Sequence, residues 1–150
     1  VRDVDLTGGA WIKIPPSESE NDLSIFIFRR RPATPSYWDF FLRKKVGKGC
    51  WNMTFGAKNG RVWSAEIFES LDDGCWHHVA FSLRRNTGED GGMVTFWLDG
   101  QVVGEPVSFA GEIAPAENWK ERWISAGQNN FPRPPLVDEV FLTSGSWRFK

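Results

Sequence analysis

The hydrophobic positions of this chain alternate with polar ones or form short apolar runs, and a helical period is almost absent. Met93–Leu98 shows the alternation clearly, because Val94, Phe96 and Leu98 share one side of an extended chain. Clusters of Gly, Pro, Asn and Asp separate the runs at intervals typical of all-β domains. The pattern predicts strands over Gly9–Ile14, Leu23–Arg30, Trp38–Lys44, Trp51–Gly56, Arg61–Phe68, His77–Arg84, Met93–Leu98, Gln101–Val103, Trp123–Ala126 and Val137–Thr143. We therefore expect a β sandwich.

The clearest turn signal is Asp99-Gly100, which stands between two apolar strand patterns. Asp-Gly accepts the positive φ angles of a type I′ turn and so predicts a hairpin. One segment departs from the strand pattern: residues 115–122 could form a turn or two of helix. The proline-rich stretches are too short to be linkers, so we expect one domain over residues 1–150.

Composition narrows the classes of function. The formal net charge is −1, which provides no long-range field to attract nucleic acid or an anionic membrane. The apolar runs are far shorter than the roughly 20 residues that span a bilayer. We therefore expect a domain that neither binds nucleic acid nor spans a membrane.

The aromatic content is unusual, with nine Trp, twelve Phe and one Tyr among 150 residues. A core of this size cannot hold nine indoles and also provide each buried N–H with a partner. Some of the tryptophans are therefore expected at the surface or in an interface.

Three segments of the chain, taken in order, have sequences that resemble those of a known family. They are Trp76-His77-His78-Val79-Ala80-Phe81, the hairpin VTFWLDGQVVG over Val94–Gly104, and Val137-Asp138-Glu139-Val140. With Asp22–Ile27 in the place of an early strand, their order and spacing resemble the laminin G-like branch of the concanavalin A-like lectin and glucanase fold. The resemblance spans nearly the whole chain. It implies two stacked antiparallel sheets in a jelly roll, with the termini on neighbouring strands and a secreted, extracellular or organelle-lumen location.

The sequence does not reproduce the catalytic residues of the glucanases in this fold. Their carboxylates alternate along one strand, and retaining hydrolysis needs two carboxyl groups about 5 to 5.5 Å apart. Asp138 and Glu139 are consecutive and so face opposite sheets, and Glu66 with Glu69 lies at a strand end. Zinc, nucleophile-elbow and nucleotide-binding motifs are also missing. We expect a protein that is not an enzyme and requires no cofactor.

Calcium is the one metal that the resemblance suggests, because Asp138 occupies an acidic position of the closing strand. Alternation places Asp138 on the apolar side with Val140 and Leu142, where its carboxylate needs hydrogen bonds or a cation. Calcium takes about six to eight oxygens. Further oxygens would have to come from Asp3, Asp5, the backbone at Gly8-Gly9, Asn129 or Asn130. We favour hydrogen bonds from protein groups and keep calcium as the alternative.

A sugar ligand would use indole faces for stacking and neighbouring amides for its hydroxyl groups. The candidates are Trp38, Trp63, Trp97, Trp119 and Trp123, with Asn129 and Asn130. Alternation places Trp63 and Trp97 off the main aliphatic side, while core packing is the competing role for each indole. We expect a non-catalytic, lectin-like carbohydrate-binding module. The alternative is a structural or accessory interaction subunit whose exposed aromatic and Arg-rich surface contacts other protein subunits.

The basic runs and the two cysteines can each be explained in two ways. The runs Arg29-Arg30-Arg31 and Arg43-Lys44-Lys45 could form a cationic patch for acidic glycans or proteins, or could protect a sheet edge by charge. Cys50 and Cys75 could form a disulfide that closes a loop of about 25 residues and contributes about 3 kcal/mol. Two free, buried thiols are the alternative.

Overall fold

The computed structural model describes residues 5–16, 22–29, 38–45, 47, 49–57, 61–85, 91–109, 127–129, 131 and 133–144. Its regular elements in this part of the chain are strands: β1 Leu6–Lys13, β2 Leu23–Arg29, β3 Trp38–Lys44, β4 Trp51–Ala57, β5 Arg61–Ile67, β6 Trp76–Arg85, β7 Gly92–Leu98, β8 Gln101–Phe109, β9 Gly127–Asn129 and β10 Leu136–Ser144. Within these ranges there is no helix of the length and hydrophobicity needed to cross a bilayer. The helical turn predicted at 115–122 lies outside the described residues.

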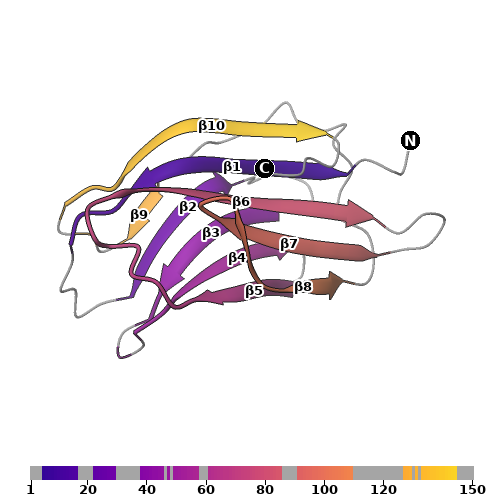
Figure 1. Cartoon of the computed structure of the whole chain (residues 1–150), viewed down its shortest axis with the longest axis horizontal. Helices are drawn as coiled ribbons and strands as arrows, with labels where there is room; N and C mark the ends of the chain where they lie inside the picture. Colours follow the sequence, from indigo (N-terminus) through magenta and orange to yellow (C-terminus); the bar gives the residue numbers. More distant parts are fainter. Residues whose placement is uncertain are drawn as a thin grey trace.

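The strands form two five-stranded antiparallel sheets. Sheet A has the order β10-β1-β6-β7-β8, and sheet B has the order β5-β4-β3-β2-β9. Figure 1 shows the two sheets stacked, with strands of sheet B crossing behind those of sheet A. Because β1 pairs with β10, the first and last strands are neighbours. The all-β, two-sheet antiparallel sandwich is confirmed.

The core lies between the two sheets and is formed by the inward positions of each strand. From sheet A, the side chains of Val79, Phe81 and Leu83 on β6 are buried. The Phe81 ring packs on Phe40 and Phe55 of sheet B, with ring centroids 4.8 and 5.0 Å apart. Alternation thus fixes which side of sheet A faces the core and which side faces outward.

The hairpin between β7 and β8 turns at Asp99-Gly100, as predicted. Both residues have positive φ angles, 49° and 82°, which is the backbone of a type I′ turn. The turn is tied to β6 because the Asp99 N–H donates to the carbonyl of His78 at 2.8 Å. The start of β6 and the tip of the hairpin therefore lie together at one end of sheet A.

A bulge interrupts the pairing of β1 with β10. Gly9 lies opposite Phe141 and Trp11 opposite Asp138, so Glu139 and Val140 together stand opposite Ala10. Glu139 adopts a left-handed backbone with φ 46°. The extra residue changes the phase of the alternation along β10, which decides where Asp138 points.

Candidate functional site

The outward side of sheet A carries a group of aromatic side chains. On β1 the buried Ala10, Ile12 and Ile14 face the core, so Trp11 between them faces outward. Trp11 lies opposite His78 of β6 on one side and opposite Asp138 of β10 on the other. The indole is 37% exposed. A large flat ring is therefore offered to solvent between an imidazole and a carboxylate.

Three rings form a continuous set, which we call the aromatic platform: Trp11, His78 and Phe141. The Trp11 and His78 rings are tilted at 57° with centroids 5.2 Å apart. The His78 and Phe141 rings are nearly parallel, at 3° and 5.9 Å. His78 and Phe141 are themselves half-buried, so Trp11 is the most accessible ring of the platform.

Trp97 lies on the same side of sheet A. It stands opposite Ala80, which in turn stands opposite Gly9. Its indole Nε1 donates to the Ser82 hydroxyl at 3.1 Å, and the side chain is half-buried. The outward position predicted for Trp97 is thus confirmed, while a role in binding stays a prediction.

Trp63 does not belong to this surface. Trp63 lies on the same side of β5 as the buried Ala65 and Ile67, and its ring packs against Phe55 and Phe109, with ring centroids 6.3 and 5.6 Å apart. The prediction that Trp63 lies off the core side was wrong, because positions 63, 65 and 67 share one side of β5 and that side faces the core. Trp63 therefore fills the space between the sheets.

The remaining predicted binding residues fall largely outside the described part. Trp38 and Asn129 belong to β3 and β9 by their backbone, and nothing is described of their side chains. Trp119, Trp123 and Asn130 lie outside the described residues. Of the predicted set, the structure therefore describes the side chains of Trp63 and Trp97, and these two lie on different sides of the sandwich layers.

Trp11 is a candidate that the sequence reasoning missed. The signal was present, because Gly9, Trp11 and Lys13 alternate with Ala10, Ile12 and Ile14. An indole placed among small and charged residues, opposite an aliphatic side, indicates an outward position.

Asp138 is exposed and does not share the core side with Val140 and Leu142. That prediction was wrong because the bulge at Glu139 inserts one residue between Asp138 and Val140, which a regular strand does not have. The Asp138 Oδ1 accepts the backbone N–H of Glu139 at 2.7 Å. No group of three or more His, Cys, Asp or Glu in the described ranges could hold a metal ion.

The electrostatic state of His78 follows from its surroundings. Burial lowers its pKa below the ordinary value, and the opposing charges of Asp99 and Glu139 do not compensate. The imidazole is therefore neutral at pH 7. Glu139, which stands with Val140 opposite Ala10 in the bulge, is one of the charges that act on this imidazole.

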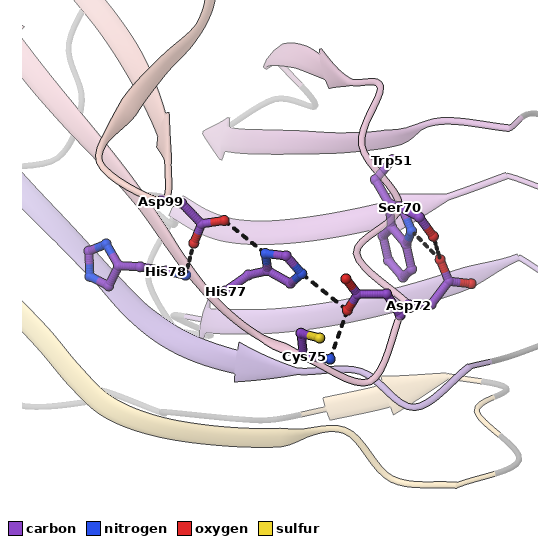
Figure 2. A network of polar contacts seen from close by, with 8 residues as sticks. Trp51, Ser70, Asp72, Cys75, His77, His78 and Asp99 are labelled. Carbon is purple, nitrogen blue, oxygen red and sulfur yellow. Dashed lines mark hydrogen bonds and ion pairs between the residues drawn. The ribbon is translucent and has the colours of Figure 1, made fainter.

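His77 faces away from the platform and belongs to a separate polar network (Figure 2). Its Nδ1 is 2.8 Å from Asp99 Oδ2, and its Nε2 is 3.2 Å from Asp73 Oδ1. Burial acts to lower the His77 pKa, but the hydrogen bonds and charges of Asp99 and Asp73 outweigh it and raise the pKa. The backbone N–H of Cys75, followed by His77, lowers the pKa of Asp73. We call Asp73, His77 and Asp99 the histidine clamp.

A second network fixes the segment between β5 and β6 to sheet B. Asp72 accepts from Lys44 Nζ at 2.7 Å and from Trp51 Nε1 at 3.1 Å. Burial acts to raise the Asp72 pKa, but these hydrogen bonds and the Lys44 charge outweigh it and lower the pKa. Figure 2 shows Ser70 reaching the same carboxylate. This network is structural, because Trp51 is fully buried.

Two ion pairs within the domain reduce the positive charge of the predicted cationic patch. Arg43 forms an ion pair with Asp22 at 2.7 Å, and Lys44 is bound to Asp72. The side chains of Arg29, Arg30 and Arg31 are not among those described. Two of the predicted cations are thus neutralised within the domain.

Of the two alternatives for Cys50 and Cys75, the structure has the free thiols and not the disulfide. The alternative of free thiols holds, although Cys75 is exposed rather than buried. Asp72 and Asp73 take over the role of fixing this segment, because Asp73 also accepts the Cys75 N–H at 2.7 Å. No covalent link is needed to hold the segment in place.

The fold and the outward aromatic platform together define a two-sheet lectin-like sandwich. The sequence model of a laminin G family, described as "Concanavalin A-like lectin/glucanases superfamily", matches residues 1–142. The chain therefore belongs to this family. A search of curated proteins finds no match.

Proposed function

We propose that this domain is a non-catalytic carbohydrate-binding module whose ligand lies on the outward side of sheet A. The observation that carries the proposal is the exposed indole of Trp11 between His78 and Asp138. A flat indole can stack on the C–H side of a sugar ring, and adjacent polar groups can read its hydroxyl groups. Asp138 can accept hydrogen bonds from sugar hydroxyls, and the His78 ring borders the indole on its other side.

Trp97 extends this surface to more than one sugar unit. Trp97 is on β7, two strands away from Trp11 on β1. Between them on β6, Trp11 stands opposite His78 and Trp97 stands opposite Ala80, so the two indoles are also offset by two residues along the strands. With strands about 4.8 Å apart and about 3.4 Å per residue, the two backbone positions are roughly 12 Å apart. An oligosaccharide can therefore contact both indoles, with the small Gly9 and Ala80 between the two ends.

The absence of catalysis is part of the proposal. The superfamily's glucanases alternate their carboxylates along one strand, whereas Asp138 and Glu139 are consecutive around a bulge. One oxygen of Asp138 is also used locally, by the N–H of Glu139. These features support recognition rather than hydrolysis of a sugar.

A protein-binding role is the second candidate. It is favoured by the row Leu136, Lys13 and Trp76, which stand opposite one another across β10, β1 and β6. Leu136 is 54% exposed and Trp76 is 42% exposed. Apolar side chains of this size at the edge of a sheet suit a protein partner as well as a sugar.

A glycan-array screen with titration calorimetry on the hits tests the proposal. The wild type and Trp11→Ala are compared with and without calcium. Phe68→Ala is the matched control, because Phe68 is 79% exposed and directly follows β5, a strand of the other sheet. We expect saturable binding that Trp11→Ala weakens at least about tenfold and Phe68→Ala leaves unchanged. If the wild type binds no glycan in either condition, the carbohydrate proposal fails and cross-linking to protein partners follows.

A further inference from the structure

The platform is bordered by two carboxylates. Asp138 lies opposite Trp11, and Glu139 acts electrostatically on His78 from the bulge next to it. Both side chains are exposed. In the described part of the chain neither carboxylate takes part in an ion pair. Within the described residues, the Trp11 indole is therefore adjacent to negative charge that no ion pair neutralises.

Fewer positive than negative groups are described near the platform. His78 contributes none at neutral pH, because burial lowers its pKa. Lys13 shares the outward side of β1 with Trp11 but lies one row away, opposite Trp76 and Leu136. Among the described side chains around Trp11 the balance is thus two carboxylates against one ammonium group.

The bulge is what places this charge beside the rings. A regular β10 would turn Asp138 and Glu139 to opposite sides of the sheet. The inserted residue leaves Asp138 outward beside Trp11, and it leaves Glu139 exposed on the edge strand of sheet A, from where its charge acts on His78. Glu139 also holds a left-handed backbone, φ 46°, which is unfavourable for a residue other than Gly.

We infer that the ligand of this surface is a cationic glycan, one whose sugars carry free amino groups. This rests on the proposed carbohydrate-binding function. The C–H side of one sugar ring stacks on Trp11, and its ammonium group donates charge-assisted hydrogen bonds to Asp138 and Glu139. The indole face adds attraction for the same positive charge.

The ring arrangement favours an amino sugar over a quaternary ammonium group. A methylated ammonium is held by several aromatic faces that enclose it. Here the Trp11 ring is tilted at 57° to His78, and His78 lies parallel to Phe141, so the platform is an open surface. An open indole beside carboxylates suits a flat sugar ring that carries a primary ammonium.

The test compares two oligosaccharides with the same sugar backbone, one with free amino groups and one in which each amino group is acetylated and uncharged. Glucosamine hexamer and its fully N-acetylated counterpart are titrated into the domain at about pH 5.5, where the sugar amines are mostly protonated and exposed carboxylates remain ionised. We expect the charged hexamer to bind at least about tenfold more tightly at low salt, with the difference decreasing as salt is added.

Matched variants assign the effect to the two carboxylates. Glu139→Gln and Asp138→Asn are expected to remove most of the preference for the charged hexamer, so that the ratio of the two affinities falls towards one in each variant. Glu66→Gln, an exposed acid on sheet B, is the control and should change neither. Asn at 138 retains an oxygen that can accept the Glu139 N–H, and thermal unfolding verifies that each variant is folded.

The outcomes separate this inference from the proposed function. Equal binding of the two hexamers, or tighter binding of the acetylated one, overturns the cationic ligand and leaves a neutral-glycan module. Tighter binding of the charged hexamer that both carboxylate variants retain also overturns the assignment. Failure of every glycan to bind overturns the carbohydrate proposal itself.

Discussion

His77 Nδ1 lies 2.8 Å from Asp99 Oδ2, and the other oxygen of Asp99 accepts the backbone N–H of His78 at 2.7 Å. A single turn residue therefore connects the hairpin to both histidines of β6 (Figure 2). Asp73 completes the histidine clamp from the segment before β6. The clamp thus joins the β7–β8 turn to the segment that precedes β6, at one end of the sandwich. The His78 ring points to the other side of the sheet, where it belongs to the platform.

The histidine clamp predicts a pH-dependent stability. The folded-state pKa of His77 is raised above its ordinary value of 6.5, so its contribution is complete below pH 6.5 and is lost as pH rises through the folded pKa. The pKa of Asp73 is lowered from 3.8, so its contribution is present above pH 3.8 and is lost as pH falls through the folded value. Both contributions are complete between these two values.

Chemical denaturation of the wild type and His77→Gln over this range is the measurement. We expect the wild type to lose about 0.5 to 1 kcal/mol above pH 6.5, a modest loss because Asp99 and Asp73 are partly exposed to solvent. His77→Gln should remove that slope. A slope of equal size in the variant would assign the pH dependence to another group.

The Asp72 network predicts a larger loss of stability than a surface ion pair. Asp72→Ala leaves the buried Trp51 N–H and the half-buried Lys44 ammonium without their acceptor, which should cost about 2 to 3 kcal/mol of unfolding free energy. The matched control is Asp22→Ala, which breaks an ion pair of the same length between side chains 44% and 40% exposed. That change should cost below about 1 kcal/mol. Urea unfolding of both variants would contradict the assignment if the two losses were equal.

Gly9 is predicted to be intolerant of a side chain. A Cβ added there would lie 2.5 Å from the Val79 carbonyl oxygen and 2.7 Å from the Ala80 Cβ, contacts with the neighbouring strand that cannot relax by side-chain rotation. Gly9→Ala should therefore destabilise the fold by about 1 to 3 kcal/mol. Gly49→Ala is the control, because a Cβ at Gly49 meets nothing within 4 Å. Thermal unfolding that shows equal effects would place β1 further from β6 than described.

Local patterning was sufficient to predict most of the sandwich. Alternation in Val94–Leu98 and Val79–Leu83 identifies the core side, because each buried side chain follows the strand period of two. Asp99-Gly100 identifies the hairpin, because few residues accept its positive φ angles. These signals depend on short stretches of chain and need no knowledge of neighbouring strands.

The candidate site was less predictable, because it depends on pairing between strands distant in sequence. The bulge at Glu139 arises from the register of β10 against β1, and nothing in Val137-Asp138-Glu139-Val140 marks an inserted residue. β8 likewise continues to Phe109 beyond the predicted Val103, through the positive φ of Gly104, by an irregular pairing opposite Thr95. A single-sequence pattern treats such positions as the end or the regular continuation of a strand.

Glu139→Gly is predicted to separate stability from binding. A non-glycine residue at φ 46° costs about 1 kcal/mol relative to Gly, so the variant should be at least as stable as the wild type and up to about 1 kcal/mol more stable. The same change removes one carboxylate beside the platform and should weaken binding of a glucosamine oligomer about tenfold. Glu139→Asn is the matched variant, since Asn also accepts this backbone and lacks the charge. Urea unfolding and calorimetry of both variants measure the two effects. Lower stability of Glu139→Gly would mean that the Glu139 side chain contributes contacts that outweigh its backbone strain, and unchanged affinity would remove Glu139 from the ligand site.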